Sequence, residues 1–190
     1  MQSIFSRFGT LIVVLGVVLV LGGWMMSSYN SLVVMNEGVD TQWAQVETQY
    51  QRRFDLIPNL VAAVQGSMKQ EKAIFLGVAE ARKGYAGART TDEKAQAAGQ
   101  MESALGRLLV VMESYPMLSS NTNVQSLMAQ LEGTENRVSV ERMRYNDVVK
   151  DYNVKVKSFP GNVLAKMFGF EVRKMFEAEV GADKAPKVEL

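Results

Sequence analysis

The chain has 190 residues, enough for about one domain, and its 21 basic and 20 acidic residues give a formal net charge of +1. This balance leaves no surplus of positive charge for binding nucleic acid. The sequence contains no cysteine and no histidine, which excludes disulfides, zinc–thiolate sites and the Ser-His-Asp and Cys-His catalytic arrangements. The low proline content, 4 residues, and the abundance of Ala, Leu, Met, Gln and Glu favour long helices over strands.

The first feature along the chain is an uncharged apolar segment. No Asp, Glu, Lys or Arg occurs between Arg7 and Glu37, and Phe8–Met26 has the length of about 20 apolar residues that a membrane helix requires. A cleaved signal peptide is the alternative, but the small pair Gly22-Gly23 is followed by bulky Trp24, and the apolar run is long. We therefore predict an uncleaved membrane anchor over residues 1–28.

The basic residues around this anchor predict its orientation. Arg7 precedes the span, whereas the first basic residues after it are Arg52 and Arg53. Basic residues close to a span tend to stay on the cytoplasmic side. We therefore expect a single-pass protein whose amino terminus lies in the cytoplasm and whose soluble domain is exocytoplasmic.

Beyond the anchor, apolar residues recur at helical spacing. Leu32, Val39 and Val46 are seven residues apart on a first helix, which Pro58 is expected to break or kink. A second helix is predicted over about residues 59–85, and a third carries an apolar stripe that ends before Pro116. The longest helix is predicted over about residues 124–159, with apolar residues at heptad spacing.

These helices together predict an all-α fold. Four long helices joined by short turns are typical of an antiparallel four-helix bundle, which we place over residues 29–180 after the transmembrane helix. A short amphipathic segment is expected over Val163–Val180, with a short carboxy-terminal helix, and a flexible polar tail over residues 181–190. The third helix starts at Thr91-Asp92-Glu93, a sound helix start without a full capping box.

Several charged residues fall on the inward rows of this predicted bundle. Arg53 continues the apolar row of the first helix, and Glu135 and Arg142 share one row of the longest helix. Buried charges require partners, so we expect Arg53 to pair with Glu135 or Glu141 on another helix. The alternative is a polar cleft that binds a ligand. We expect no metal site, because the nearby carboxylates lack a loop of oxygen ligands.

Three further features have competing interpretations. Trp43 resembles part of a cofactor site, but its heptad spacing favours a place in the core. Gly133 lies inside the longest helix and predicts a close approach of another helix there. The apolar carboxy-terminal segment, with Phe159 and Met167 flanked by lysine and arginine, either caps the bundle or faces a membrane or partner helix.

A set of motifs carries a resemblance to a known family. The motifs are Tyr29-Asn30, Leu32-Val33, Glu37, Val39, Trp43, Val46, residues 51–61 (QRRFDLIPNLV), Ala81-Arg82, Glu113, Tyr115-Pro116, residues 131–137 (LEGTENR), Tyr145-Asn146, Tyr152-Asn153, Phe159-Pro160 and Phe168-Gly169-Phe170. In this pattern the chain resembles the LemA family over about residues 8–180. It departs from the family at Phe54, often a small residue, and at Gln65-Gly66-Ser67, often Lys-Gly-Tyr.

The resemblance implies a bacterial membrane-anchored bundle of long antiparallel helices. It implies no reaction, because the family has no established activity. One branch is associated with internal membranes of magnetosome-forming bacteria, and family genes often neighbour a gene for a membrane zinc metalloprotease. These associations suggest membrane organisation or envelope quality control, with a membrane protease as a candidate partner.

We therefore expect a non-catalytic scaffold or interaction protein of the bacterial cytoplasmic (inner) membrane, with no cofactor and no nucleic-acid partner. The alternative is a membrane-tethered sensor or ligand-binding domain that uses the inward charges. Self-assembly into a homo-oligomer is expected, through small residues in the span and the apolar row from Leu32 to Val46. The structural or interaction candidates are Trp43, Arg52, Arg53, Asp55, Pro58, Glu132, Gly133, Glu135, Arg137, Arg142, Phe168 and Phe170.

Overall fold

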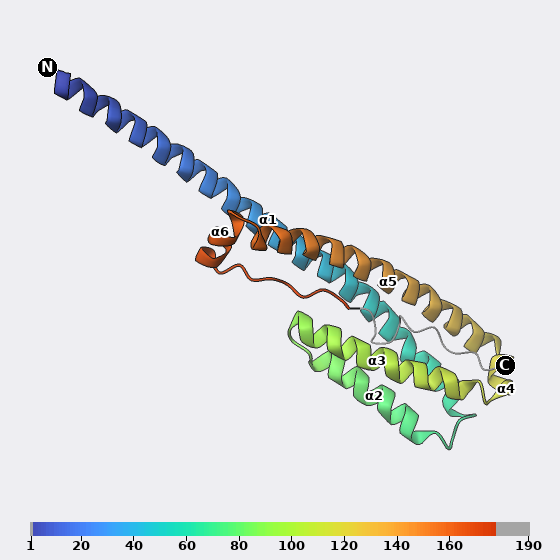
Figure 1. Cartoon of the computed structure of the whole chain (residues 1–190). Helices are drawn as coiled ribbons and strands as arrows, with labels where there is room; N and C mark the ends of the chain where they lie inside the picture. The colour runs from blue at the N-terminus through green and yellow to red at the C-terminus, as the bar shows by residue number, and fades with distance from the viewer. Residues whose placement is uncertain (1, 178–190) are drawn as a thin grey trace, which may run out of the picture. The chain divides into compact units, whose positions relative to one another are not determined.

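The structure, a computed structural model, describes residues 2–177 and is all-helical within that range. The helices are α1 (Gln2–Gln65), α2 (Lys72–Gly87), α3 (Thr91–Met112), α4 (Pro116–Ser119), α5 (Thr122–Lys157) and α6 (Gly161–Phe168) (Figure 1). The predicted all-α class, with a long apolar helix at the amino terminus and several further helices, is confirmed. The predicted tail, residues 181–190, lies outside the described residues.

The chain divides into two compact units, and α1 and α5 each contribute to both. The first unit combines the residues up to Thr41 with Asp147–Arg173. The second combines Gln42–Asn146 with the described residues from Lys174 onward. The second unit therefore contains α2, α3 and α4 together with parts of the two longest helices.

The amino-terminal part of α1 is the one described stretch long and apolar enough to cross a membrane. Its most apolar window has a mean hydropathy of 2.3 and is 0% buried. The large apolar side chains from Leu11 to Leu21 are 51–72% exposed. Such exposure is costly in water and ordinary in lipid, so this part of α1 is consistent with a single-pass membrane anchor.

Helix α1 continues without a break through Pro58, where the sequence predicted a break or a kink. Proline removes one internal hydrogen bond and costs about 3 kcal/mol in a helix interior. Here Ile57 and Leu60, on either side of it, are 1% and 0% exposed, and burying each such side chain contributes about 1.5–3 kcal/mol. The helix instead ends at Gln65, before a turn in which the amides of Ser67 and Met68 both donate to the Val64 carbonyl at 3.0 Å. The predicted second helix is therefore divided between α1 and α2.

In the second unit, parts of α1 and α5 pack with α2 and α3 around an apolar core. Gln42 of α1 donates to Glu141 of α5 at 2.8 Å, and farther along α1 Arg53 donates to Glu135 at 3.3 Å. The α5 numbers fall as the α1 numbers rise, so these two segments run antiparallel. The fully buried large side chains of this unit include Val46, Tyr50, Ile57, Leu60, Val64, Met68, Met101, Leu105 and Leu108.

The apolar row proposed for self-association is used inside the fold. Leu32 and Val39 are 0% and 1% exposed in the first unit, and Trp43 and Val46 are 7% and 0% exposed in the second. The prediction that this row pairs with neighbouring copies is therefore wrong. These side chains already have partners within their own unit.

Helix α3 begins with a complete capping box, one residue earlier than the sequence suggested. The Thr90 hydroxyl accepts a hydrogen bond from the Glu93 amide at 3.2 Å, and the Glu93 carboxylate accepts from the Thr90 amide at 3.1 Å. A third bond, from the amide of Arg89 to the Glu93 carboxylate at 2.8 Å, joins the loop to this cap. These backbone donors lower the pKa of Glu93. Thr90, rather than Thr91, is the N-cap residue.

The carboxy-terminal segment is helical only over α6. Gly169, with φ of 76°, ends the helix in the left-handed conformation that glycine adopts without strain. Residues 170–177 then have no regular secondary structure. The short carboxy-terminal helix that the sequence predicts is therefore α6, and residues 178–180 of the predicted amphipathic segment lie outside the described range.

Candidate functional site

The predicted inward charges form a cluster in the second unit. Arg53 is 6% exposed, and its guanidinium lies 3.3 Å from the Glu135 carboxylate and 3.9 Å from that of Glu102 on α3. Arg142 of α5 lies 3.7 Å from the other carboxylate oxygen of Glu102. The expected pairing of Arg53 with Glu135 is therefore present, and Glu102 joins both arginines.

The cluster balances two positive charges with two negative charges from three helices. The Glu135 side chain remains 64% exposed, whereas that of Glu102 is 20% exposed. Burial, followed by the charge of Glu102, raises the pKa of the neighbouring Tyr50 hydroxyl. The geometry of these side chains is that of charge pairing between helices.

A groove of about 660 Å³ lies over this cluster. Arg53 and Arg142 line it together with Glu102, Glu135 and Glu177. The Nε atom of Arg53 is buried and has no hydrogen-bond partner among the described residues. The groove is therefore the place where a ligand would meet the inward charges.

The other charged candidates of the same two motifs do not join the cluster. Arg52, Asp55, Glu132 and Arg137 are all exposed on α1 or α5. Glu141, the second expected partner of Arg53, instead accepts hydrogen bonds from Gln42 and Arg144. Residues next to each other in sequence point to different sides of a helix, so only one residue of the Arg52-Arg53 pair faces inward.

Two further candidates lie elsewhere in the second unit. Gly133 is exposed, and a Cβ atom added to it would have no neighbour within 4 Å. The predicted close helix approach at Gly133 is therefore wrong. Pro58 lines a shallow apolar groove of about 370 Å³ with Val61, Phe75 and Val78.

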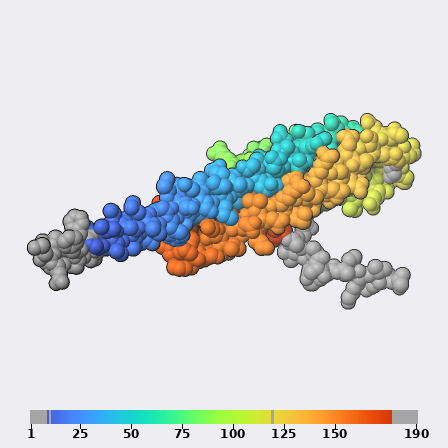
Figure 2. All heavy atoms as spheres, turned by 90° about the horizontal axis from the view of Figure 1, so that it is seen from above, coloured from blue at the N-terminus to red at the C-terminus, as the bar shows by residue number. Residues whose placement is uncertain are grey.

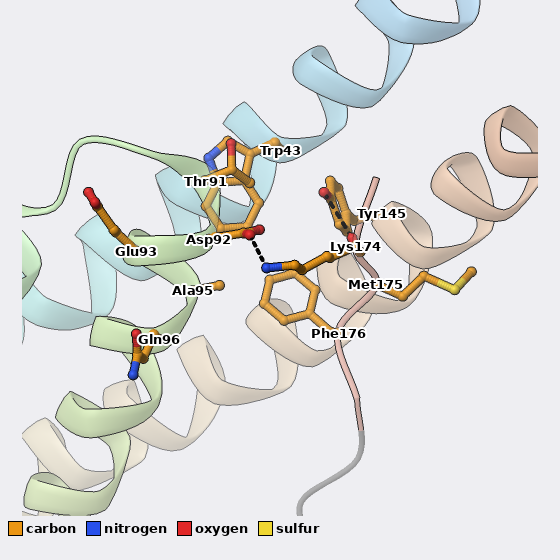
Figure 3. A pocket seen from close by; sticks show the side chains of 10 residues that line it. All are labelled: Trp43, Thr91, Asp92, Glu93, Ala95, Gln96, Tyr145, Lys174, Met175 and Phe176. Carbon is orange, nitrogen blue, oxygen red and sulfur yellow. Dashed lines mark hydrogen bonds and ion pairs between the residues drawn. The ribbon is translucent and has the colours of Figure 1, made fainter. Parts of the chain in front are cut away.

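Trp43 belongs to an aromatic cluster in the second unit (Figure 3). Its ring stacks on Phe176 at 5.7 Å between centroids and meets Tyr145 edge-on at 5.6 Å. The Arg142 guanidinium lies 4.6 Å from the Phe176 centroid, in the range of a cation–π contact. A hollow of about 310 Å³ borders the cluster, with the Lys174–Asp92 ion pair beside it. The core position predicted for Trp43 is confirmed by its 7% exposure.

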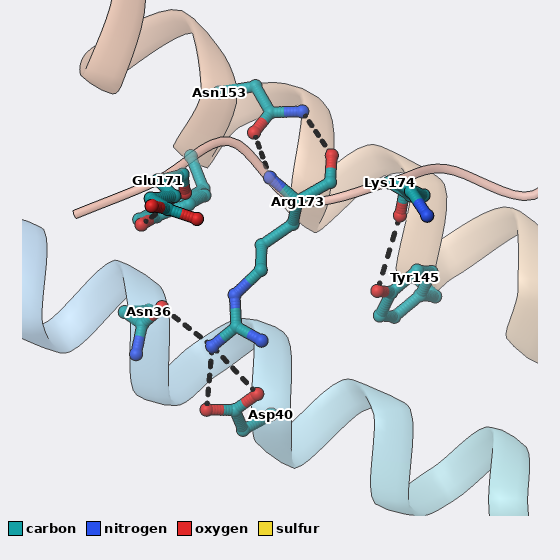
Figure 4. A network of polar contacts seen from close by, with 8 residues as sticks. Asn36, Asp40, Tyr145, Asn153, Glu171, Arg173 and Lys174 are labelled. Carbon is teal, nitrogen blue, oxygen red and sulfur yellow. Dashed lines mark hydrogen bonds and ion pairs between the residues drawn. The ribbon is translucent and has the colours of Figure 1, made fainter. Parts of the chain in front are cut away.

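The segment after α6 is held through its backbone, which the sequence analysis did not anticipate. In the first unit, the Asn153 side chain donates to the Arg173 carbonyl and accepts from the Arg173 amide, both at 2.8 Å (Figure 4). The Tyr152 hydroxyl donates to the Glu171 carbonyl at 2.9 Å. The Arg173 guanidinium donates to Asn36 at 2.9 Å and pairs with Asp40 at 3.2 Å.

The same pair of residue types recurs in the second unit. The Asn146 side chain donates to the Phe176 carbonyl at 2.9 Å and accepts from its amide at 2.8 Å. The Tyr145 hydroxyl donates to the Lys174 carbonyl at 3.3 Å. The signal for these contacts is visible in the sequence as Tyr-Asn repeated after seven residues, at 145–146 and 152–153.

The spacing of this repeat fits an extended peptide. Seven helical residues rise about 10.5 Å, close to the roughly 10 Å that three extended residues span. Correspondingly, the bound residues of the segment, Arg173 and Phe176, are three apart. Because the asparagines bind amide and carbonyl groups, these contacts place few demands on the side chains of the segment.

Comparison with known proteins agrees with this helical organisation. The model of the LemA family matches residues 42–190. The chain belongs to the LemA family. The match begins in α1 after the apolar stretch and includes the charge cluster and the Tyr-Asn repeat.

The most similar relatives found include magnetosome proteins. The chain is 28% identical to magnetosome proteins MamQ 1 and MamQ 2 of Paramagnetospirillum magneticum, over 84% of this chain and 68% of each relative. It is 27% identical to magnetosome protein MamQ of Magnetospirillum gryphiswaldense, with the same coverage. The family and these relatives, together with the apolar helix, indicate a membrane-associated helical protein of bacterial type.

Proposed function

We propose that this LemA-family protein is a non-catalytic scaffold of the bacterial inner membrane. The observation that carries the proposal is α1, one helix that contains both the apolar stretch and core residues of both units. Such a helix would tie a charge-paired helical domain to the bilayer without a linker. The inward charges are used to join helices, which favours a structural role over a chemical one.

The biological setting that we propose is the organisation of membranes. The relatives in magnetotactic bacteria are named as magnetosome proteins, which favours membrane organisation over envelope quality control. A membrane protease remains a proposed partner in the second setting. We place the domain of residues 29–180 outside the cytoplasm, since Arg7 is the basic residue close to the span.

Self-assembly of the scaffold would use the span itself. Gly9, Gly16 and Gly23 are seven residues apart on α1, and a Cβ atom added to any of them would meet nothing within 4 Å. Small residues on one face of a membrane helix permit close approach of a second helix. The apolar row from Leu32 to Val46 is buried within the fold, so we assign the pairing to this face of the span.

A substitution on this face tests the proposal. Gly16→Ile with Gly23→Ile should reduce self-association, because branched side chains prevent close approach of the helices. Val18→Ile with Met25→Ile is the matched control on the opposite face of α1. Subunits are counted by photobleaching of the full chain in lipid nanodiscs and by mass photometry in mild detergent. A wild-type protein that stays monomeric over a wide concentration range would contradict self-assembly.

A ligand-binding function is the second candidate. The groove of about 660 Å³ above Arg53, with the buried Nε atom of Arg53 unpaired among the described residues, is the observation that favours it. Small carboxylates and phosphates are the ligands that a guanidinium prefers. Calorimetry of the wild type and Arg142→Gln with such anions distinguishes this function from scaffolding, because the scaffold requires no anion binding.

A further inference from the structure

The outer face of α6 and Phe159, two residues before the helix, expose large apolar side chains. Phe159 is 82% exposed, Val163 56% and Met167 55%, whereas Leu164 and Ala165 on the inner face are 3% and 1% exposed. Helix α6 is therefore packed on one side and apolar on the other. An exposed apolar surface of this kind marks a contact with lipid or protein.

Ring contacts within the first unit place α6 beside the end of the apolar stretch. The Phe168 ring lies 4.7 Å from that of Tyr29, and the Phe170 ring lies 5.9 Å from it. Figure 2 shows the red-orange atoms of this carboxy-terminal region lying against the blue part of α1. Tyr29 follows Met26 by three residues, a rise of about 4.5 Å along a helix.

This position corresponds to the headgroup layer of a bilayer. If Phe8–Met26 spans the hydrocarbon core of about 30 Å, Tyr29 and the rings packed on it lie in the polar layer, about 5–7 Å thick, on that side. Tyrosine and other amphipathic aromatic residues are enriched at this depth. The apolar face of α6 is thus continuous with the membrane surface that the apolar stretch of α1 requires.

The charge of the segment agrees with a lipid surface. Residues 152–170 contain Lys155, Lys157 and Lys166 but no aspartate or glutamate. Helices that lie in the interface combine such lysines with large apolar side chains. A bilayer with anionic lipids therefore fits both the apolar and the charged groups of this segment.

We propose that α6 and Phe159 form a second membrane contact, an interfacial helix whose outer side chains insert among the lipids of the bilayer that α1 crosses. This inference rests on the proposed membrane anchor and adds a lipid-binding surface to it. The domain is then held at the bilayer by two elements of the first unit, and α6 also lies where it can respond to lipid composition.

Spin labels on single cysteines test the depth of α6. Because the natural chain has no cysteine, labels can be attached at Phe159→Cys, Val163→Cys and Met167→Cys in the full chain. The protein is reconstituted in vesicles of phosphatidylethanolamine and phosphatidylglycerol. Relaxation by oxygen, which enters lipid, is compared with relaxation by a water-soluble nickel chelate.

The chain offers matched controls in the second unit. Met143, 60% exposed, is the control for Met167, and Met117, 81% exposed, is the control for Phe159. We expect the α6 labels to show a clear shift toward oxygen over nickel relative to these controls. High nickel accessibility on α6 would overturn the proposal, and so would protection from both reagents, which would identify a protein partner.

A label at Leu19→Cys separates this proposal from the anchor on which it rests. Oxygen access at Leu19 together with nickel access on α6 would disprove the interfacial helix and leave the anchor intact. Nickel access at Leu19 would disprove the anchor and the interfacial helix with it. Oxygen access at both places supports both.

Discussion

Arg53 combines a buried position with partners of very different exposure. Its side chain is 7% exposed, but that of Glu135 is 64% exposed and Glu102 also has Arg142 nearby. Removing Arg53 therefore leaves carboxylates that water or another arginine can still stabilise. The cost should lie below the roughly 3–5 kcal/mol that follows when one partner of a fully buried pair is removed.

We expect Arg53→Ala to lower the free energy of unfolding by about 2 kcal/mol, partly through lost packing of the arginine stem. Arg53→Met, which keeps volume, should cost less. Glu135→Gln should change stability by about 1 kcal/mol or less, because exposed pairs contribute little. Urea unfolding of the three variants, followed by circular dichroism in detergent, gives these values. An Arg53→Ala midpoint equal to the wild type would show that the cluster does not stabilise the fold.

Tyr85 is a half-buried residue whose hydroxyl oxygen is shielded from solvent. Burial raises its pKa to about 12, and its oxygen has no hydrogen-bond partner among the described residues. In the unfolded chain the pKa is about 10. Between these values the unfolded state releases its proton while the folded state retains it, so stability present below pH 10 is lost as the pH rises through the folded pKa.

We expect Tyr85→Phe to keep or raise stability at pH 7 and to weaken the loss of stability between pH 10 and 12. The first effect follows because no hydrogen bond is removed, and the second because the titrating group is gone. Tyr115→Phe is the control, since the Tyr115 hydroxyl donates to Glu71 at 3.2 Å and that bond would be lost. Urea midpoints at pH 7 and pH 11 provide the comparison. Equal alkaline losses in Tyr85→Phe and wild type would argue against a perturbed Tyr85.

Replacing Gly133 or Gly161 by alanine should have opposite effects on the stability of the protein. Gly133 lies exposed inside α5 with free space around it, whereas a Cβ atom on Gly161 would overlap the Lys155 carbonyl oxygen. Gly133→Ala should stabilise the protein by about 0.5–1 kcal/mol, because alanine restricts the unfolded chain and favours helix. Gly161→Ala should destabilise it by about 1–3 kcal/mol through overpacking. Thermal melts of both variants test this, and a loss of stability in Gly133→Ala would restore the close-approach interpretation.

The presence of the long helices could be predicted from the sequence, but the end of α1 and the extent of the carboxy-terminal helix could not. Apolar periodicity predicted α3 and α5, and it correctly predicted that Arg53 is buried. The continuation of α1 through Pro58 depends on burial of Ile57 and Leu60 against other helices, which local rules do not include. The backbone of residues 170–177 binds to the Tyr-Asn pairs of α5 and does not form a helix. These pairs lie about 20 to 30 residues earlier in the chain, beyond the reach of local rules.

The candidate site was partly predictable for the same reason. The apolar row of α1 showed that Arg53 faces inward, and the need for a partner connected it to Glu135, although the Glu135 side chain is itself 64% exposed. Glu102 was not predicted, because the apolar stripe of α3 does not show which of the polar residues beside it meets another helix. A carboxylate that joins two arginines becomes recognisable only when three helices are brought together.

Helix α1 contains the apolar stretch and contributes residues to both units. Helix α1 runs from Gln2 to Gln65 without interruption. Cleavage within the apolar stretch would remove the amino-terminal part of a helix whose residues Leu32 and Val39 are core residues of the first unit. A retained anchor is therefore consistent with the way in which the first unit is built.

The residues around the apolar stretch predict how the chain is processed and oriented in the membrane. We expect the mature chain to keep its amino-terminal residues, because Phe8–Met26 carries no clear cleavage signature, and to place its domain outside the cytoplasm, because Arg7 stays inside. Amino-terminal sequencing of the membrane fraction tests whether the amino-terminal residues are retained.

The orientation is tested by a carboxy-terminal fusion to alkaline phosphatase, which is active only outside the cytoplasm. A matched fusion to green fluorescent protein is the control, and Arg7→Glu should lower the phosphatase signal. Fluorescence without phosphatase activity would reverse the orientation, and a soluble chain beginning near Trp24 would exclude the anchor.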